Sequence, residues 1–148
     1  MTFDRMGRVI RSVCGEADFE EFVRRLVFTI LACNPDAHLK NWSLWYPDGR
    51  RPRLSPAYDL VSTCGYVQVA RELACRLGDE WDLRKIRSWH FGKLAARAGV
   101  DVQRGVDLAN AAAQAFRDSW KSLGRGLPLG ESERSALERH LDDTKLPD

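Results

Sequence analysis

Apolar residues recur with a helical period in the first third of the chain. Asp18 and Glu21, three residues apart, have the spacing of a capping box that would begin this helix. Pro35 disfavours helical geometry at Asn34, so we expect the helix to end there. Phe28 and Leu31 add apolar surface on a second side of this helix, which predicts that it is buried on nearly all sides. Steps of three and four residues place one apolar face along it: Phe19, Phe22, Val23, Leu26, Val27 and Ile30.

The pattern changes to alternation after residue 41. Trp42, Leu44 and Tyr46 alternate with Ser43 and Trp45, a period of two that predicts a strand. The pair Asp48-Gly49 is favoured in tight hairpin turns, and Pro52 places the returning strand, residues 51–54, at a sheet edge. We interpret Trp42, Trp45 and Tyr46 as packing residues of this hairpin rather than as a platform for stacking a ligand.

The other segments are predicted to be helical, including Leu73–Leu77. Asp82 and Asp107 are candidate N-caps of two of these helices. The expected fold is therefore mainly α, a single domain over residues 1–148 with one short β-hairpin. The predicted helices cover residues 1–17 with a break at Gly15, then about 18–33, 83–98, 108–123 and 132–141.

Composition adds few constraints. The 148 residues include 44% hydrophobic and 30% charged residues, with a net charge of +2, as in ordinary globular proteins. The arginines are scattered, which argues against direct nucleic-acid binding, and we interpret them as mostly solvated surface. No apolar run approaches the roughly 20 residues that span a bilayer, and no secretory signal is evident, so we expect a cytoplasmic protein.

The four cysteines are Cys14, Cys33, Cys64 and Cys75. They form no Cys-x-x-Cys pair, and none of the three histidines lies at a metal-ligand offset from them. We therefore expect free thiols packed as small hydrophobic residues, and no structural zinc site.

Groups capable of chemistry are concentrated between Asn34 and Asp59. Asp36 and Asn41 have the five-residue spacing of the base and the metal-binding Asn in protein-kinase catalytic loops. The predicted hairpin would return Asp59 close to Asn41, so that both could share one metal ion. The spacing alone is weak evidence, because an Asp that follows Asn-Pro can simply stabilise a turn.

The ordered residues Asn34-Pro35-Asp36-Ala37-His38-Leu39-Lys40-Asn41, followed by Pro56-Ala57-Tyr58-Asp59, closely resemble the C-terminal lobe of HipA-like serine/threonine kinases. These kinases are the toxins of HipBA toxin–antitoxin pairs. The resemblance extends less sharply from about Phe3 to Leu141. It implies a helical kinase-like C-lobe, the cofactors Mg²⁺ and ATP, a protein substrate and a HipB-like DNA-binding antitoxin.

The resemblance also implies roles for residues at matching positions. Asp36 would orient the attacking hydroxyl, and Asn41 and Asp59 would bind magnesium and, through it, the nucleotide. His38 and Lys40 belong to the catalytic motif: we expect His38 to orient the loop, while Lys40 either approaches a phosphate or is a surface charge. We expect Tyr58 to pack under the metal-binding segment and fix Asp59.

The sequence departs from the family pattern in two ways. Cys33 replaces a common Gly, and Thr29 replaces a common Asn, from which we expect only packing changes. The chain also shows no Gly-rich loop or strand lysine of a nucleotide-gripping N-terminal lobe. We therefore expect the isolated chain to have little or no kinase activity. It would be either a catalytic lobe that needs a separate N-lobe, or a non-enzymatic module that binds an antitoxin or such a lobe.

Overall fold

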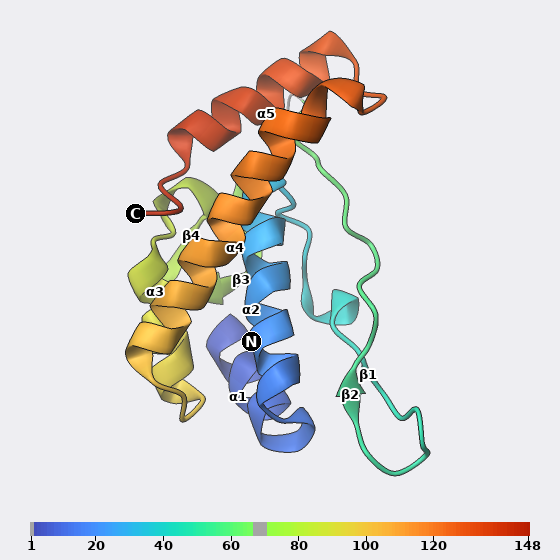
Figure 1. The fold of residues 1–148 in the computed structure, drawn as a ribbon, viewed down its shortest axis with the longest axis vertical. Helices are drawn as coiled ribbons and strands as arrows, with labels where there is room; N and C mark the ends of the chain where they lie inside the picture. Colours follow the sequence, from blue (N-terminus) through green and yellow to red (C-terminus); the bar gives the residue numbers. More distant parts are fainter. Residues whose placement is uncertain (1, 67–70) are drawn as a thin grey trace.

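The computed structural model describes residues 2–66 and 71–148, which fold into a mainly helical structure with two small antiparallel hairpins (Figure 1). This confirms the predicted fold class and adds a second hairpin to it. The elements are α1 (Phe3–Cys14), α2 (Glu16–Leu31), η1 (Leu39–Asn41), β1 (Leu44–Trp45), β2 (Arg53–Leu54), β3 (Glu72–Leu77), β4 (Glu80–Asp82), η2 (Leu83–Lys85), α3 (Ser88–Arg97), α4 (Val102–Leu123), η3 (Gly124–Gly126) and α5 (Glu131–Asp143).

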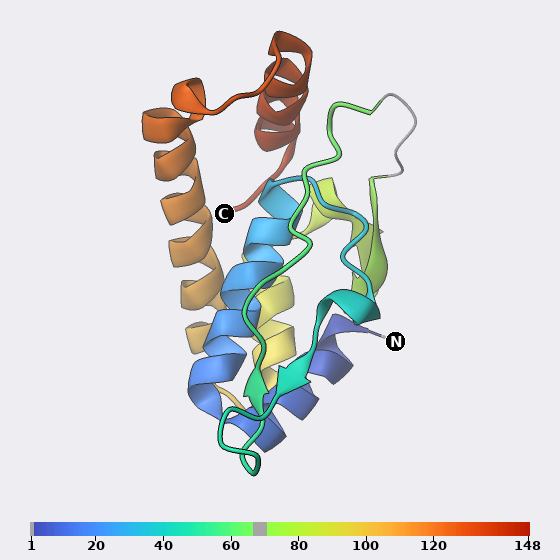
Figure 2. The same cartoon turned by 90° about the vertical axis from the view of Figure 1, so that its right-hand side faces the viewer.

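Helix α2 lies at the centre of the core. The helix packs against α1 on one side and α4 on another, and α3 contacts both of those helices (Figures 1 and 2). All six residues of the predicted apolar face are fully buried, which confirms that face. The prediction of burial on nearly all sides is wrong at Phe28, which is 40% exposed and packs edge-on against Phe116 of α4.

The start of α2 differs from its prediction. The helix begins at Glu16 after Gly15, which has a φ of 95° and provides no side-chain cap. Asp18 is therefore not the N-cap: its buried carboxylate instead accepts two hydrogen bonds from Arg53 of β2, at 2.7 and 3.2 Å. A two-point pairing of guanidinium and carboxylate satisfies a buried charge better than one backbone N–H could. The helix ends at Leu31, three residues before Asn34.

The first hairpin is confirmed and is shorter than predicted. In it, β1 pairs with β2 in antiparallel register, with Leu44 opposite Leu54. Trp42 precedes β1 and packs edge-on against Phe3 and Phe22 of the core, with ring centroids 5.9 and 4.8 Å apart. The packing role is confirmed for Trp42 but wrong for Trp45 and Tyr46, which remain about half exposed on the strand and turn.

The second hairpin was not predicted. Residues 73–77 form most of strand β3, so the prediction of a helix there is wrong. Leu73, Cys75 and Leu77 are buried and alternate with exposed residues, a period of two that suits one face of a strand. The strand pairs with β4, and the Ala74 N–H donates to the Pro35 carbonyl oxygen at 2.9 Å. This contact places β3 directly beside the loop that follows α2.

Helices α3 and α4 approach each other closely. At Gly105, an added Cβ would lie 2.5 Å from the Phe91 carbonyl oxygen, so the crossing requires glycine. The predicted cap Asp107 lies inside α4 and accepts a hydrogen bond from Gln103, while Asp101 is the actual N-cap. Asp82 does cap a helix, but the short η2 rather than α3. Within residues 2–66 and 71–148, no helix is long and apolar enough to span a membrane.

The C-terminal segment is fastened to α2 and α4 by polar contacts. The fully buried His140 of α5 lies with Nε2 2.7 Å from the Ile30 carbonyl oxygen near the end of α2. Arg117 of α4 donates to the carbonyl oxygens of Leu141, Thr144 and Leu146 at 2.7–3.0 Å. The carbonyls of Leu141 and Thr144, at the C-terminal end of α5, are thereby satisfied.

Candidate active site

The loop from Asn34 to Asn41 leaves α2 through a left-handed turn. Cys33 has a φ of 56°, a backbone conformation that residues other than glycine rarely adopt. The Cys33 position is therefore one that favours glycine for a backbone reason. Beyond it, the bond from β3 to the Pro35 carbonyl and the packing of Trp42 hold the two ends of the loop against the core.

The fold brings Asn41 and Asp59 together. Asn41 Nδ2 donates to Asp59 Oδ2, although the residues are 18 positions apart. Both line a small depression together with Asn34, Ala57 and Tyr58. The prediction that the hairpin returns Asp59 to Asn41 is confirmed in its geometry.

Asp59 is also positioned through its backbone. Its φ of 56° is left-handed, and its carbonyl oxygen accepts a hydrogen bond from the buried Asn34 amide at 3.3 Å. Tyr58 ties the same segment to the loop. Its hydroxyl donates to the Lys40 carbonyl oxygen at 2.6 Å and lies 2.6 Å from Ser43 Oγ. Tyr58 is 42% exposed, so it fixes the segment by hydrogen bonding and does not pack beneath it.

The remaining motif residues lie on the outer side of the loop. Asp36 is exposed, and its Oδ1 lies 3.5 Å from Nε2 of the half-exposed His38. The His38 carbonyl oxygen accepts from the Asn41 N–H at 2.9 Å, which links this pair to the Asn41–Asp59 pair through the backbone. The Lys40 side chain is exposed. The motif residues thus form two pairs, Asp36–His38 and Asn41–Asp59, which one backbone hydrogen bond connects. The carbonyl oxygen of Lys40 accepts a hydrogen bond from Tyr58.

The Asn41–Asp59 pair is chemically suited to magnesium. Asn41 Oδ1 is buried and has no hydrogen-bond partner among the described residues. It lies on the same side chain whose Nδ2 contacts the exposed Asp59 carboxylate. Mg²⁺ prefers oxygen ligands and commonly takes only one or two carboxylates, together with water and phosphate oxygens. The residues present therefore fit such an ion.

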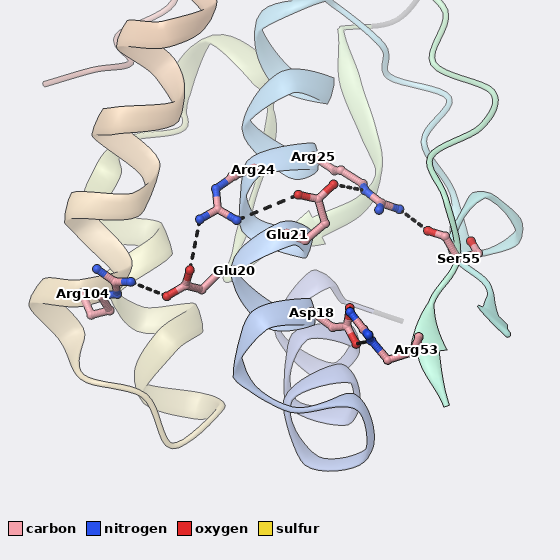
Figure 3. A network of polar contacts seen from close by, with 8 residues as sticks. All are labelled: Asp18, Glu20, Glu21, Arg24, Arg25, Arg53, Ser55 and Arg104. Carbon is pink, nitrogen blue, oxygen red and sulfur yellow. Dashed lines mark hydrogen bonds and ion pairs between the residues drawn. The ribbon is translucent and has the colours of Figure 1, made fainter. Parts of the chain in front are cut away.

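Arg25 of α2 and Arg53 of β2 support this arrangement. The prediction that the arginines are mostly solvated surface charges did not include this structural role. Arg25 Nε donates to Glu21 at 2.7 Å, and its Nη1 donates to the Ser55 carbonyl oxygen at 2.5 Å (Figure 3). The Arg53–Asp18 pair fastens the preceding strand to the same helix (Figure 3). Since Ser55 lies four residues before Asp59, α2 aligns the chain that carries this acid. The i,i+4 spacing of Glu21 and Arg25 was the available signal.

Comparison with known proteins places this geometry in a family. The model of the HipA-like C-terminal domain matches residues 1–120. The chain belongs to the HipA-like C-terminal domain family. In Sinorhizobium fredii, the protein named "Putative kinase Y4dM" is 36% identical over 141 residues, which cover 95% of this chain and 34% of that protein.

Two further relatives come from Shewanella oneidensis. The serine/threonine-protein kinase toxin HipA is 32% identical over 92 residues, covering 62% of this chain and 20% of the toxin. A solved structure of HipA with HipB and operator DNA superposes with a TM-score of 0.75, covering 97% of this chain and 34% of that one at 23% identity, which shows the shared fold. The HipA-like chain described here spans about a third of the length of Y4dM.

Proposed function

We propose that this HipA-like chain is the acid- and metal-holding part of a serine/threonine protein kinase, which transfers the γ-phosphoryl group of ATP to a protein hydroxyl. The observation that carries the proposal is the contact between Asn41 and Asp59: the Asn41 amide nitrogen donates to the exposed Asp59 carboxylate, and the Asn41 amide oxygen has no hydrogen-bond partner among the described residues. Phosphoryl transfer needs a carboxylate that orients the attacking hydroxyl and oxygen ligands that hold magnesium. Asp36 can supply the first, and Asn41 and Asp59 can supply the second.

The proposed roles follow from position. Asp36 is exposed, so its carboxylate can accept the proton of an incoming hydroxyl. His38 lies beside Asp36 and orients its carboxylate, and the exposed Lys40 can approach a phosphate. Asn41 and Asp59 would hold Mg²⁺, which when bound neutralises charge on the phosphate oxygens. Tyr58 and Asn34 keep these ligands in register.

The remaining parts of the kinase would come from outside these 148 residues. Y4dM is about three times as long, and protein kinases cover the phosphates with a Gly-rich loop and hold the nucleotide with a strand lysine, neither of which occurs in these 148 residues. We propose that a nucleotide-gripping lobe completes the site, and that a HipB-like antitoxin is a partner, as HipB is in the complex with the related toxin.

A second candidate function is a non-enzymatic interaction module. It is favoured by an apolar depression of about 290 Å³ beside the loop, between α1, η1 and the first hairpin. Val9, Leu39 and Leu44 line it and are 47%, 45% and 38% exposed. An exposed apolar surface of this kind is typical of a protein contact.

The proposal is tested by measuring phosphoryl transfer from ATP, in the presence of Mg²⁺, to a library of peptides that contain serine and threonine. The chain alone should give little or no transfer, and the chain joined to the N-terminal part of Y4dM should give measurable transfer. Asp36→Asn should then lower the rate by about 10²–10⁴-fold, the usual contribution of a positioned base. Asp48→Asn is the matched control, because Asp48 only accepts turn hydrogen bonds that an Asn can also accept.

Binding of nucleotide with magnesium separates the two candidates. Asp59→Ala should abolish magnesium-dependent nucleotide binding by the joined protein. If the joined protein folds but binds no nucleotide, the kinase proposal is wrong and the interaction module is favoured. Robust turnover by the 148-residue chain alone, lost in Asp36→Asn, would contradict the need for a second lobe.

A further inference from the structure

Two cysteines and a histidine meet next to the start of the candidate catalytic loop, because one of them is Cys33, the residue before Asn34. Cys33, Cys64 and His140 each place one ligand atom within 4.8 Å of the others. They come from three separate parts of the chain: the turn after α2, the segment beyond Asp59, and α5. We call them the Cys₂His cluster. Their separation in sequence explains why ligand spacing along the chain did not reveal them.

His140 has one ring nitrogen without a hydrogen-bond partner among the described residues. The residue is fully buried, and its Nε2 lies 2.7 Å from the Ile30 carbonyl oxygen, which can only accept a hydrogen bond. Nε2 therefore carries the ring proton, and Nδ1 is left with a lone pair. Nδ1 is buried and has no hydrogen-bond partner among the described residues. A histidine whose other nitrogen donates to a backbone carbonyl has the arrangement common in metal-bound imidazoles.

The two cysteines are held together by the backbone. The Thr63 N–H and Oγ1 both donate to the Cys33 carbonyl oxygen, at 3.0 and 3.1 Å, which fixes the residue next to Cys64. Cys33 is buried and occupies its left-handed conformation despite carrying a side chain. Backbone strain of this kind is found at functional sites, where surrounding contacts maintain it.

We propose that the Cys₂His cluster binds a divalent metal ion, zinc, through the sulfurs of Cys33 and Cys64 and Nδ1 of His140. Thiolate and imidazole ligands together select Zn²⁺ over the hard ions Mg²⁺ and Ca²⁺. Three protein ligands leave a fourth tetrahedral position, which a water molecule can fill on the side of the partly exposed Cys64. The bound ion would fasten the candidate catalytic loop and the Asp59 segment to α5.

The local electrostatics agree with this ligand set. The Cys64 side chain lowers the pKa of Cys33, and Cys33 in turn raises the pKa of Cys64, so a bound cation would displace the proton held by the Cys64 sulfur. Arg71 contributes positive charge nearby, but the Asp143 carboxylate lies 3.6 Å from its guanidinium group. This pairing reduces the repulsion that a cation in the cluster would experience.

Cobalt titration of the reduced 148-residue chain tests the site, since Co²⁺ substitutes for Zn²⁺ in tetrahedral thiolate sites and is coloured. We expect one Co²⁺ per chain, with a thiolate-to-cobalt charge-transfer band and intense visible bands that Zn²⁺ removes. Zinc should also raise the melting temperature, because the three ligands come together only in the folded chain, which therefore binds the ion more tightly than the unfolded chain does.

Matched variants distinguish the cluster from incidental thiol binding. Cys64→Ser and His140→Gln should lose the intense bands, and Cys14→Ser, which changes a cysteine outside the cluster, should keep them. Circular dichroism verifies that each variant is folded; the partly exposed Cys64 is the variant least expected to disturb the core. The proposal is wrong if the folded wild-type chain shows no tetrahedral bands, or if Cys64→Ser retains them. It is also wrong if the reduced chain binds no metal and the cysteines instead form a disulfide in air.

Discussion

The β1–β2 hairpin lies on the surface next to the candidate active site, whereas the β3–β4 hairpin buries one face of its longer strand in the core. Only Leu54 is buried among the four strand residues of the first. This hairpin is held to α2 by an ion pair between Arg53 and Asp18, and by a hydrogen bond from Arg25 of α2 to the Ser55 carbonyl oxygen. In the second hairpin, by contrast, Leu73, Cys75 and Leu77 are buried.

This difference indicates that the two parts of the candidate active site are held with different firmness: the loop from Asn34 to Asn41 firmly, and the segment that carries Asp59 less so. Local opening costs least where few apolar contacts must be broken. The loop from Asn34 to Asn41 is joined to β3 through Pro35, while Asp59 is carried by the chain that leaves β2. We therefore expect Asp59 to separate from Asn41 more readily than the loop separates from the core.

The largest expected effect comes from the buried hairpin. Leu77→Ala should lower the free energy of unfolding by about 2–5 kcal/mol, because it removes a fully buried side chain and leaves a cavity. Urea denaturation measures the change. The matched variant Leu44→Ala in the first hairpin, where the leucine is 38% exposed, should cost less than about 1 kcal/mol. Equal losses in the two variants would contradict the comparison.

A smaller and local effect is expected at the polar anchor. Arg53→Gln leaves the buried Asp18 carboxylate without its two-point partner, so the first hairpin should open more often while the core stays folded. Hydrogen exchange should become faster over residues 44–59 and remain unchanged over β3. Arg51→Gln, which changes a neighbouring exposed arginine, is the control. Faster exchange throughout the chain would show instead that the ion pair stabilises the whole fold.

The smallest effect is a pH dependence on the side of the second hairpin. His90 of α3 lines a depression with Gly78 and Glu80, and burial lowers the pKa of His90 below its ordinary value. The unfolded chain then binds the proton more tightly than the fold. The stabilisation is therefore complete above about pH 6.5, the usual histidine pKa, and is lost as the pH falls through the lower folded value.

Melting temperatures between pH 7.5 and pH 5 measure this effect. Nδ1 of His90 accepts a hydrogen bond from the Arg87 N–H, a capping contact that glutamine can also make. His90→Gln should therefore keep the cap and flatten the pH dependence. An unchanged slope in this variant would assign the acid sensitivity to other groups.

Local patterns predicted much of the fold and the proximity of one residue pair. The apolar period of α2, the Asp48-Gly49 turn and the helix ends near residues 98 and 123 depend on neighbouring residues, and the structure has each of them. Residues 73–77 were misread because a short apolar run suits either a helix or a buried strand, and only packing against the core decides. The predicted caps at Asp18 and Asp107 are wrong because both helices begin earlier, at Glu16 and Val102, so these carboxylates lie inside the helices and accept from Arg53 and Gln103 instead.

The sequence by itself determined the central helix, the first hairpin and the motif that identifies the family, because periodicity, turn preference and ordered spacing act over short distances. Tertiary structure alone decided the long-range contacts that no sequence pattern predicted. It set Arg25 to hold the segment before Asp59, and it gathered Cys33, Cys64 and His140 from three parts of the chain. Such contacts depend on how helices cross and where the backbone turns, and spacing along the chain does not encode them.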